Sequence, residues 1–314
     1  MSSARSRPGR AADRLFLLRP EEAIALLFLA PTAYLTVEAA RYAREAGVLG
    51  ARYPGGVVRL GVTLGLLAGL AGAAWLWPRA RAVAATRDVL PFLACVLIYT
   101  NLHDTIGFVN PHDVHDSLVR IDAALFGAQP SIWAERFVSR ELTEVMSFFY
   151  ASFVWIAPST SLLLLVLGRR REFRAATLGV VLCFYLGYAL YVAFPAAPPR
   201  LVLALEYQRD LAGYPNRLFQ MTRYAFELLP VDSRAAFPSL HAAVSLLAAH
   251  YAWRFLRPWF WVLAPCVLGL WVSTIYLRHH YAVDLLAGWA LAPAAAWLAP
   301  RLDVWWARRA ARMS

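Results

Sequence analysis

The sequence contains no lysine and only three cysteines among its 314 residues. Cys95, Cys183 and Cys266 each lie inside an apolar segment, and none belongs to a short Cys-x-x-Cys spacing. We therefore expect buried thiols, and neither a disulfide nor a zinc site. All 31 basic side chains are arginines and give a formal net charge of +11, yet charged residues make up only 16% of the chain. This is too few for the surface of an ordinary soluble domain.

The chain contains several long apolar runs. The chain is 60% hydrophobic, and its mean hydropathy of +0.49 indicates an integral membrane protein. A helix needs about 20 apolar residues to cross a bilayer. We expect an all-α integral membrane fold with about eight transmembrane helices, at residues 22–40, 57–77, 86–102, 143–167, 175–194, 238–256, 259–278 and 280–299.

The arginines predict the orientation of these helices. With a cytoplasmic N-terminus, the short inner segments hold 18 of the 31 arginines, and residues 169–174 form the clearest inner anchor. We predict a multi-pass protein of the plasma (inner) membrane with basic cytoplasmic tails at residues 1–20 and 300–314. We read residues 1–20 as a tail before the first span and not as a removed signal peptide. Arginines placed between apolar runs mark topology, so no nucleic-acid partner is expected.

Two segments on the predicted outer side are too polar to span a membrane. Residues 103–142 carry apolar residues at helical spacing, at Val114, Leu118, Ile121 and Leu125, which predicts a helix lying along the interface. Residues 195–237 form a proline-rich loop that ends in a short amphipathic piece. Long ordered loops above a membrane bundle are typical of lids or binding elements.

Histidines stand at the start of two apolar runs on this outer side. In residues 235–247, Ser239 follows Pro238 as a helix N-cap, and His241 lies in the first turn, where it could protonate a leaving oxygen. In residues 277–289, His280 and Asp284 are four positions apart, on one face of a helix, so the carboxylate can orient the imidazole as a nucleophile or base. A pair that only ties helices together remains an alternative for this spacing alone. We expect these side chains at a solvent-exposed mouth outside the packed bundle.

PSLH at residues 238–241, followed about 39 residues later by HHYAVD, resembles the PSGH and SRxxxxxHxxxD motifs of the type 2 phosphatidic acid phosphatase superfamily. The longer stretches FPSLHAA, YLRHHYAVDLLAG and IDAALFGAQPSIW are similar to its inositolphosphotransferase-like branch, which contains fungal inositol phosphorylceramide synthase. The resemblance covers residues 86–299. It implies a six-helix catalytic membrane domain there, preceded by two further transmembrane helices in residues 21–85.

The resemblance also implies a mechanism. His280 would attack phosphorus to form a phosphohistidine, Asp284 would orient it, and His241 would protonate the leaving alkoxide, with no metal or cofactor. A lipid phosphate or phospholipid would be the donor. Water as acceptor would give a phosphatase, and a lipid alcohol would give a transferase.

The chain departs from the superfamily's pattern of cations. The motif KxxxxxxRP cannot be matched without lysine, and Arg200 of FPAAPPR stands in its place. The arginine expected six residues before His280 is Thr274, so Arg278 is the nearest substitute. Fewer cations suit a phosphodiester better than a phosphomonoester, which favours the transferase. The predicted substrate-binding residues are Arg200, Ser239, Arg278 and Pro238.

Other polar residues allow further interpretations. Asp116, Arg120 and His279 are candidate contacts for the acceptor or headgroup, and Asp122 is a weaker one. The HDVHD segment at residues 112–116 has a spacing that could hold a divalent metal, but we expect a wet amphipathic stretch and no metal. A transporter with a histidine–aspartate proton relay and a non-catalytic scaffold remain alternatives.

Overall fold

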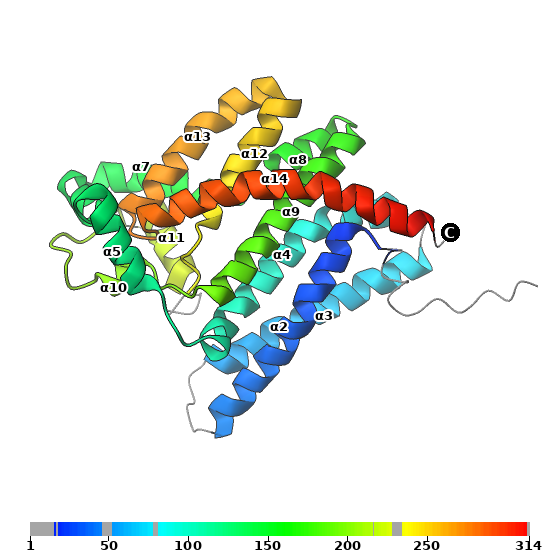
Figure 1. Ribbon diagram of the computed structural model, residues 1–314, viewed down its shortest axis with the longest axis horizontal. Helices are drawn as coiled ribbons and strands as arrows, with labels where there is room; N and C mark the ends of the chain where they lie inside the picture. The colour runs from blue at the N-terminus through cyan, green and yellow to red at the C-terminus, as the bar shows by residue number, and fades with distance from the viewer. Residues whose placement is uncertain are drawn as a thin grey trace, which may run out of the picture.

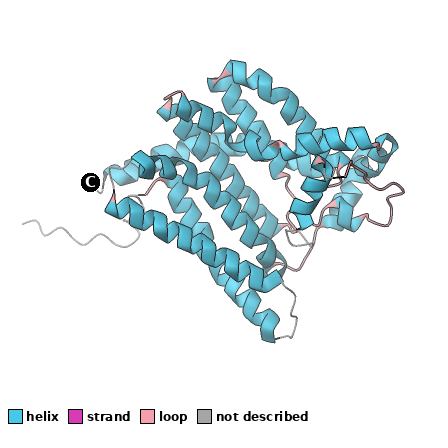
Figure 2. Cartoon of the chain, turned by 180° about the vertical axis from the view of Figure 1, so that it is seen from behind, coloured by secondary structure: helices cyan, strands magenta, loops and turns pink. Residues whose placement is uncertain are grey.

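The structure is a computed structural model that describes residues 16, 18–45, 52–77, 81–215, 217–227 and 234–312. Every regular element in this part of the chain is a helix (Figures 1 and 2). The long helices are α2 (Pro20–Glu45), α3 (Arg52–Leu76), α4 (Arg81–Val109), α7 (Arg140–Ala151), α8 (Phe153–Val166), α9 (Arg170–Ala193), α12 (Leu240–Phe255), α13 (Arg257–Tyr276) and α14 (Ala282–Ala311). The shorter elements are α5 (His115–Phe126), α6 (Pro130–Trp133), the 3-10 helix η2 (Ala134–Phe137), α10 (Pro199–Val202) and α11 (Leu218–Glu227). The predicted N-terminal tail lies mostly outside the described residues.

Several of these helices can cross a membrane. Five helical segments of the described chain are long and apolar enough, namely Pro20–Tyr42, Arg140–Val166, Arg170–Ala193, Arg257–Tyr276 and Ala282–Ala311. The all-α prediction is confirmed, but the number of eight transmembrane helices is not established. One physical reason is length, since α12 has 16 residues, and another is charge, since α4 carries Arg87 and Asp88 within its apolar sequence.

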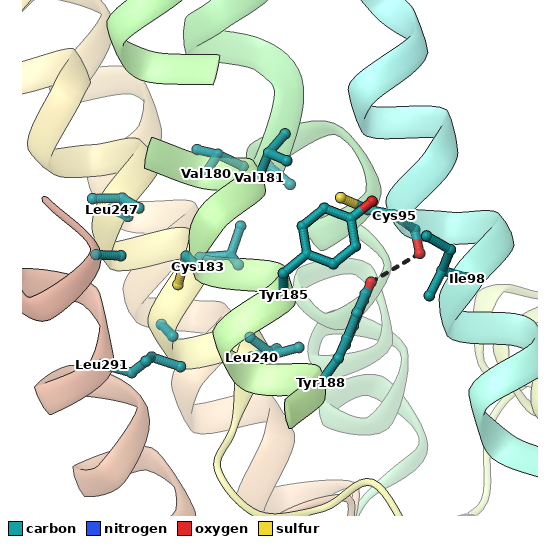
Figure 3. Packing of buried hydrophobic residues seen from close by; sticks show 14 of the residues in the cluster. Cys95, Ile98, Val180, Val181, Cys183, Tyr185, Tyr188, Leu240, Leu247 and Leu291 are labelled. Carbon is teal, nitrogen blue, oxygen red and sulfur yellow. Dashed lines mark hydrogen bonds between the residues drawn. The ribbon is translucent and has the colours of Figure 1, made fainter. Parts of the chain in front are cut away.

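Helix α9 forms the centre of the bundle and contacts α2, α4, α8, α12 and α14. Figure 3 shows Tyr185 and Tyr188 of α9 beside Cys95 and Ile98 of α4. The buried hydroxyl of Tyr188 donates a hydrogen bond of 2.9 Å to the carbonyl of Cys95, so no polar group of this side chain is left unsatisfied. The aromatic core fixes the helices that end at the site described below.

Ion pairs attach the N-terminal helix α2 to this core. Arg19 and Arg170 both pair with Asp88, and Arg174 pairs with Glu21. These two carboxylates are 1% and 0% exposed, so their charges depend on the arginines for compensation. The pairs lie near Arg170, where α9 begins, whereas the opposite end of α9 leads to the candidate site.

The polar loops gather at one end of the bundle, together with α5, α7, α10 and α11 (Figure 1). Ala196 donates a backbone hydrogen bond to Arg234 and accepts one from Ala236, both at 3.0 Å, which places the FPAAPPR loop beside the start of α12. The predicted helix within residues 103–142 is present as α5. It buries Leu118, whereas Ile121 and Leu125 are 41% and 58% exposed.

Candidate active site

Two helix starts and one turn build the site. Ser239 is the N-cap of α12, as predicted, and its Oγ accepts a hydrogen bond of 3.2 Å from the amide of Ala242. Its own amide donates to the carbonyl of Asp284 at 3.0 Å, which joins α12 to α14. The helices approach so closely that a Cβ on Gly288 would lie 2.4 Å from the carbonyl oxygen of Ser239. Only glycine fits there. Pro238, immediately before the cap, is buried.

The turn between α13 and α14 presents the second histidine. The amides of His279 and His280 both donate to the carbonyl of Thr274, at 2.9 and 3.2 Å. Arg278 has a φ of 63°, which turns the chain back before α14 begins at Ala282. The prediction that His280 and Asp284 share one face of a helix is therefore wrong in detail. His280 precedes the helix, and Asp284 reaches it because a helix carboxylate in the first turn can face the incoming chain.

His280 lies between Asp284 and His241. Its Nδ1 is 3.2 Å from Oδ2 of Asp284, and the same oxygen accepts a hydrogen bond of 2.9 Å from the amide of Tyr281. Its Nε2 is 3.1 Å from Nδ1 of His241. A carboxylate accepts and cannot donate, so it favours the tautomer with the proton on Nδ1 and the lone pair on Nε2, facing His241.

These groups are buried, contrary to the expectation of a solvent-exposed mouth. His280 is 3% exposed and Asp284 is 0% exposed. The turn residues and the loop at 195–200 cover them, since the hydroxyl of Tyr281 donates to the carbonyl of Ala197 at 3.1 Å. Burial lowers the pKa of His280 to about 3, and the positive charge of Arg200 acts in the same direction.

Because the imidazole of His280 is neutral at physiological pH, we expect that activity does not decrease on the acid side of the pH profile. An ordinary histidine with a pKa near 6.5 would lose about tenfold in its neutral form between pH 7.5 and 5.5. Because the pKa of His280 is lowered to about 3, we expect no fall in kcat/KM between pH 7.5 and pH 5.5.

The same shift lowers stability in acid. The unfolded chain binds a proton at pH values where the folded His280 does not, so the free energy of unfolding decreases as the pH falls below about 6.5. Circular dichroism must therefore accompany the rate measurement. A tenfold fall in kcat/KM with an unchanged spectrum would contradict the prediction.

Arg200 is connected to the site by a hydrogen bond to His279. Its Nη1 donates to Nδ1 of His279 at 2.7 Å, so His279 carries its proton on Nε2. The rings of His279 and His241 both pack on Tyr150, with centroids 4.4 and 4.9 Å away. The backbone amide of Arg200 also donates to the carbonyl of Arg278 at 2.9 Å. A guanidinium is thus fixed beside the two histidines.

The structure gives Arg278 other partners. Its Nη2 lies 3.0 Å from Oε1 of Glu135 and also donates to the carbonyl of Arg209. Its guanidinium packs 3.7 Å above the ring centroid of Tyr207. This cation is therefore already paired, which leaves Arg200 as the better placed of the two arginines for a phosphate next to His280.

Asp116 and Arg120 are not brought together with the histidines. Asp116 has a side chain that is 78% exposed, and Arg120 donates to Ser117 in its own helix. Nearby, Asp113 pairs with Arg234 at 3.4 Å and lies 3.9 Å from His115. In the described part of the chain no group of three or more histidine, cysteine, aspartate or glutamate side chains is arranged to hold a metal ion.

The contact of Asp122 with the start of helix α14 was not predicted from the sequence. Asp122 lies on α5, is 1% exposed, and accepts hydrogen bonds of 2.8 Å from the amides of both Ala282 and Val283. These are the first amides of α14, and Tyr281 at the N-cap has no side chain that usually serves as a cap. Two signals in the sequence could have indicated this contact, namely an aspartate beside the apolar positions Leu118 and Ile121 of an amphipathic helix and a helix start without a capping side chain.

Comparison with known proteins supports the motif-based interpretation. A profile of the PAP2 superfamily matches residues 116–298. The chain is 35% identical over 116 residues to the inositol phosphorylceramide synthase catalytic subunit AUR1 of Saccharomyces cerevisiae, covering 32% of this chain and 28% of that protein. It is 31% identical over 115 residues to the phosphoinositol dihydroceramide synthase of Bacteroides thetaiotaomicron, covering 33% and 37%. A PA-phosphatase related-family protein of Dictyostelium discoideum is 27% identical over 107 residues, covering 33% and 19%.

These alignments therefore span about a third of this chain and at most 37% of the relatives named here. No solved structure matches the chain. The superfamily profile, in contrast, covers more than half of it, including both histidine motifs. The protein thus belongs to the PAP2 superfamily.

Proposed function

We propose that this enzyme transfers a phospho-headgroup from a lipid donor to a lipid alcohol through a phosphohistidine at His280. The observation that carries the proposal is the placement of His280, whose Nδ1 faces Asp284 and whose Nε2 faces His241. One nitrogen is oriented by a carboxylate and the other is directed at a group able to move a proton. This is the arrangement that covalent catalysis by an imidazole requires.

In the first step the donor phosphate displaces the contact between the two histidines. Nε2 of His280 attacks phosphorus, a nitrogen–phosphorus bond forms, and the bond from phosphorus to the lipid oxygen breaks. His241 in its protonated form, which the anionic phosphate favours, gives a proton to the departing alkoxide. Arg200 offsets the charge that develops on the phosphoryl oxygens. Asp284 stabilises the positive charge on the imidazole ring.

The second step is the reverse with a different alcohol. The hydroxyl of a lipid acceptor gives its proton to His241 and attacks phosphorus, and the bond to His280 breaks. Water at the same position would make the enzyme a phosphatase. The pairing of Arg278 with Glu135 supports transfer, because a single well-placed arginine suits the one negative charge of a phosphodiester.

The site belongs on the extracytoplasmic side of the inner membrane in this proposal. Helix α9 begins at Arg170 within the arginine-rich segment 169–174 and ends at Ala193, next to the loop that carries Arg200. Arginine clusters favour the cytoplasmic side. The two ends of one helix therefore separate the predicted inner anchor from the catalytic residues.

Asp122 acts as a positioning residue in this scheme. Asp122→Asn leaves one of the two α14 amides facing an amide group that cannot accept its hydrogen bond. Loss of one charge-assisted bond corresponds to about 10- to 100-fold, and we expect this loss in kcat with KM changed less than about twofold. The matched control is Asp116→Asn, an exposed carboxylate on the same helix. A fall in the yield of folded protein with normal kcat would assign Asp122 to stability alone.

The proposed reaction is tested with purified protein in liposomes. Labelled phosphatidylinositol is supplied with and without a diacylglycerol or ceramide acceptor, and His280→Ala is the blank. We expect a new labelled phospho-headgroup lipid that forms only with an acceptor. Release of inorganic phosphate from lipid monophosphates, without transfer, would instead identify a phosphatase.

A further inference from the structure

Helix α13 ends in a turn that usually contains glycine. The amide of Arg278 donates to the carbonyl of Ile275 at 3.0 Å, and the amide of His279 donates to the carbonyl of Thr274 at 2.9 Å. These two hydrogen bonds define a Schellman motif, in which the residue after the C-cap is left-handed and is most often glycine. Here that residue is an arginine with a φ of 63°. A side chain in this conformation carries a cost equivalent to about 5- to 150-fold in population, and it persists only where other contacts hold it.

A buried carboxylate from a distant element holds the side chain of Arg278. The Nη2 atom of Arg278 lies 3.0 Å from Oε1 of Glu135, which belongs to η2, and the guanidinium packs 3.7 Å above the ring centroid of Tyr207. Arg278 is 7% exposed and Glu135 is 8% exposed. Removal of either partner would leave the other charge buried without compensation, so the pair keeps the arginine in one position.

We propose that Glu135 is a positioning residue for the reaction at His280, because it holds the turn after α13 in its left-handed conformation. The inference rests on the proposed function for the role of His280 as nucleophile, and it deepens that function by naming a residue of η2 that controls where the nucleophile lies. It also assigns to Arg278 the role of an anchor for the turn, in place of the predicted contact with the substrate phosphate.

The turn carries the nucleophile and also holds the segment with the nearby guanidinium. Two residues after Arg278, the amide of His280 donates to the carbonyl of Thr274 at 3.2 Å. The carbonyl of Arg278 accepts a hydrogen bond of 2.9 Å from the backbone amide of Arg200. A change in the φ of Arg278 would therefore move the imidazole of His280 relative to its side-chain partners and release the segment that carries Arg200. A shift of about 1 Å in a reacting group can cost about 100-fold in rate.

Glu135 is itself fixed by backbone groups of another segment. Its carboxylate accepts hydrogen bonds from the amides of Gln208 and Arg209, at 3.3 and 3.0 Å. The carbonyl of Arg209 accepts from the guanidinium of Arg278 in turn. The buried carboxylate thus has several donors, as a buried charge requires. One side chain therefore ties η2, this loop and the turn after α13 together.

Glu135→Gln removes the charge and keeps the size of the side chain. We expect it to lower the rate of diacylglycerol release from phosphatidylinositol at least about tenfold, because the strained turn loses the contact that compensates it. Full-length protein in nanodiscs is assayed under single-turnover conditions. The matched control is Glu141→Gln, an exposed glutamate of α7 whose carboxylate accepts from the hydroxyl of Tyr214. A rate in Glu135→Gln within twofold of wild type would overturn the inference.

Two substitutions of Arg278 separate anchoring of the turn from contact with the phosphate. Arg278→Ala and Arg278→Gly both remove the guanidinium, but glycine adopts a positive φ without the steric penalty that alanine carries. Each is combined with Glu135→Gln, so that no buried carboxylate loses its counterion. We expect the double variant with glycine to release diacylglycerol at least about fivefold faster than the one with alanine. Equal rates in the two double variants would contradict the anchoring role of Arg278.

Hydrogen exchange separates failure of this inference from failure of the proposed function, because it requires no turnover. The amides of residues 277–280 all donate to carbonyl groups of α13. We expect these amides to exchange at least about fivefold faster in Glu135→Gln than in wild type or Glu141→Gln, while peptides of α9 are unchanged. Faster exchange in a protein that acts on no lipid donor would preserve the anchored turn and remove the proposed function. Unchanged exchange would remove the anchored turn even if headgroup transfer were established.

Discussion

Replacement of His280 with alanine should lower the rate of transfer by about a millionfold, the effect seen when a catalytic nucleophile is removed from a site whose groups act as a unit. The physical reason is that Nε2 of His280 is the atom that bonds to phosphorus, and no other described nucleophile is held between Asp284 and His241. The measurement is the single-turnover rate of headgroup transfer with labelled donor lipid.

Folding must be checked in this variant because His280 is 3% exposed and not at a wet surface. Size-exclusion chromatography and thermal unfolding in detergent serve that purpose. His250→Ala is the matched control, since His250 is an exposed histidine on α12, the helix that also carries His241. Transfer in His280→Ala within tenfold of wild type would exclude His280 as the nucleophile.

Replacement of Asp284 with asparagine should reduce turnover by about four orders of magnitude, by analogy with aspartates that orient a catalytic histidine. An amide at this position can donate to Nδ1 of His280 and so favours the tautomer whose proton lies on Nε2, where it blocks attack. The variant also lacks the negative charge that stabilises the imidazole once phosphorus is attached. Single-turnover rates with phosphatidylinositol measure the effect.

The fold of the Asp284→Asn variant should be unchanged, so a lower turnover can be attributed to the missing carboxylate. The backbone carbonyl of Asp284, which accepts from the amide of Ser239, is unaffected by the substitution, and asparagine has nearly the same size and shape as aspartate. Chromatographic behaviour like that of wild type is therefore expected. Wild-type turnover in a folded Asp284→Asn protein would show that His280 does not need this carboxylate.

Local sequence patterns predicted the positions of most helices and part of the candidate site. Apolar runs gave the positions of the long helices, and a proline–serine pair gave the N-cap of α12 at Ser239. The pairing of His280 with Asp284 followed from a spacing of four residues, although a turn and not a helix brings the histidine into place. Each of these features depends on residues close together in the chain.

Contacts between distant segments could not be predicted from one sequence. Arg278 pairs with Glu135 and Asp122 caps α14, contacts that join residues 143 and at least 160 positions apart. Burial of His280 has the same origin, because it depends on how the 195–200 loop folds over the turn. Residue propensity and spacing predict where a helix starts, but they do not indicate which distant carboxylate accepts hydrogen bonds from its first amides.

The most direct test of the account is to trap the covalent intermediate. Wild-type protein is mixed with labelled phosphatidylinositol without acceptor, quenched in alkaline denaturant, in which phosphohistidine persists, and mapped by peptide mass spectrometry. The account predicts an inositol phosphate adduct on His280 that is absent in His280→Ala and disappears when a lipid alcohol is added. An adduct on a different residue, or efficient transfer by His280→Ala, would contradict it.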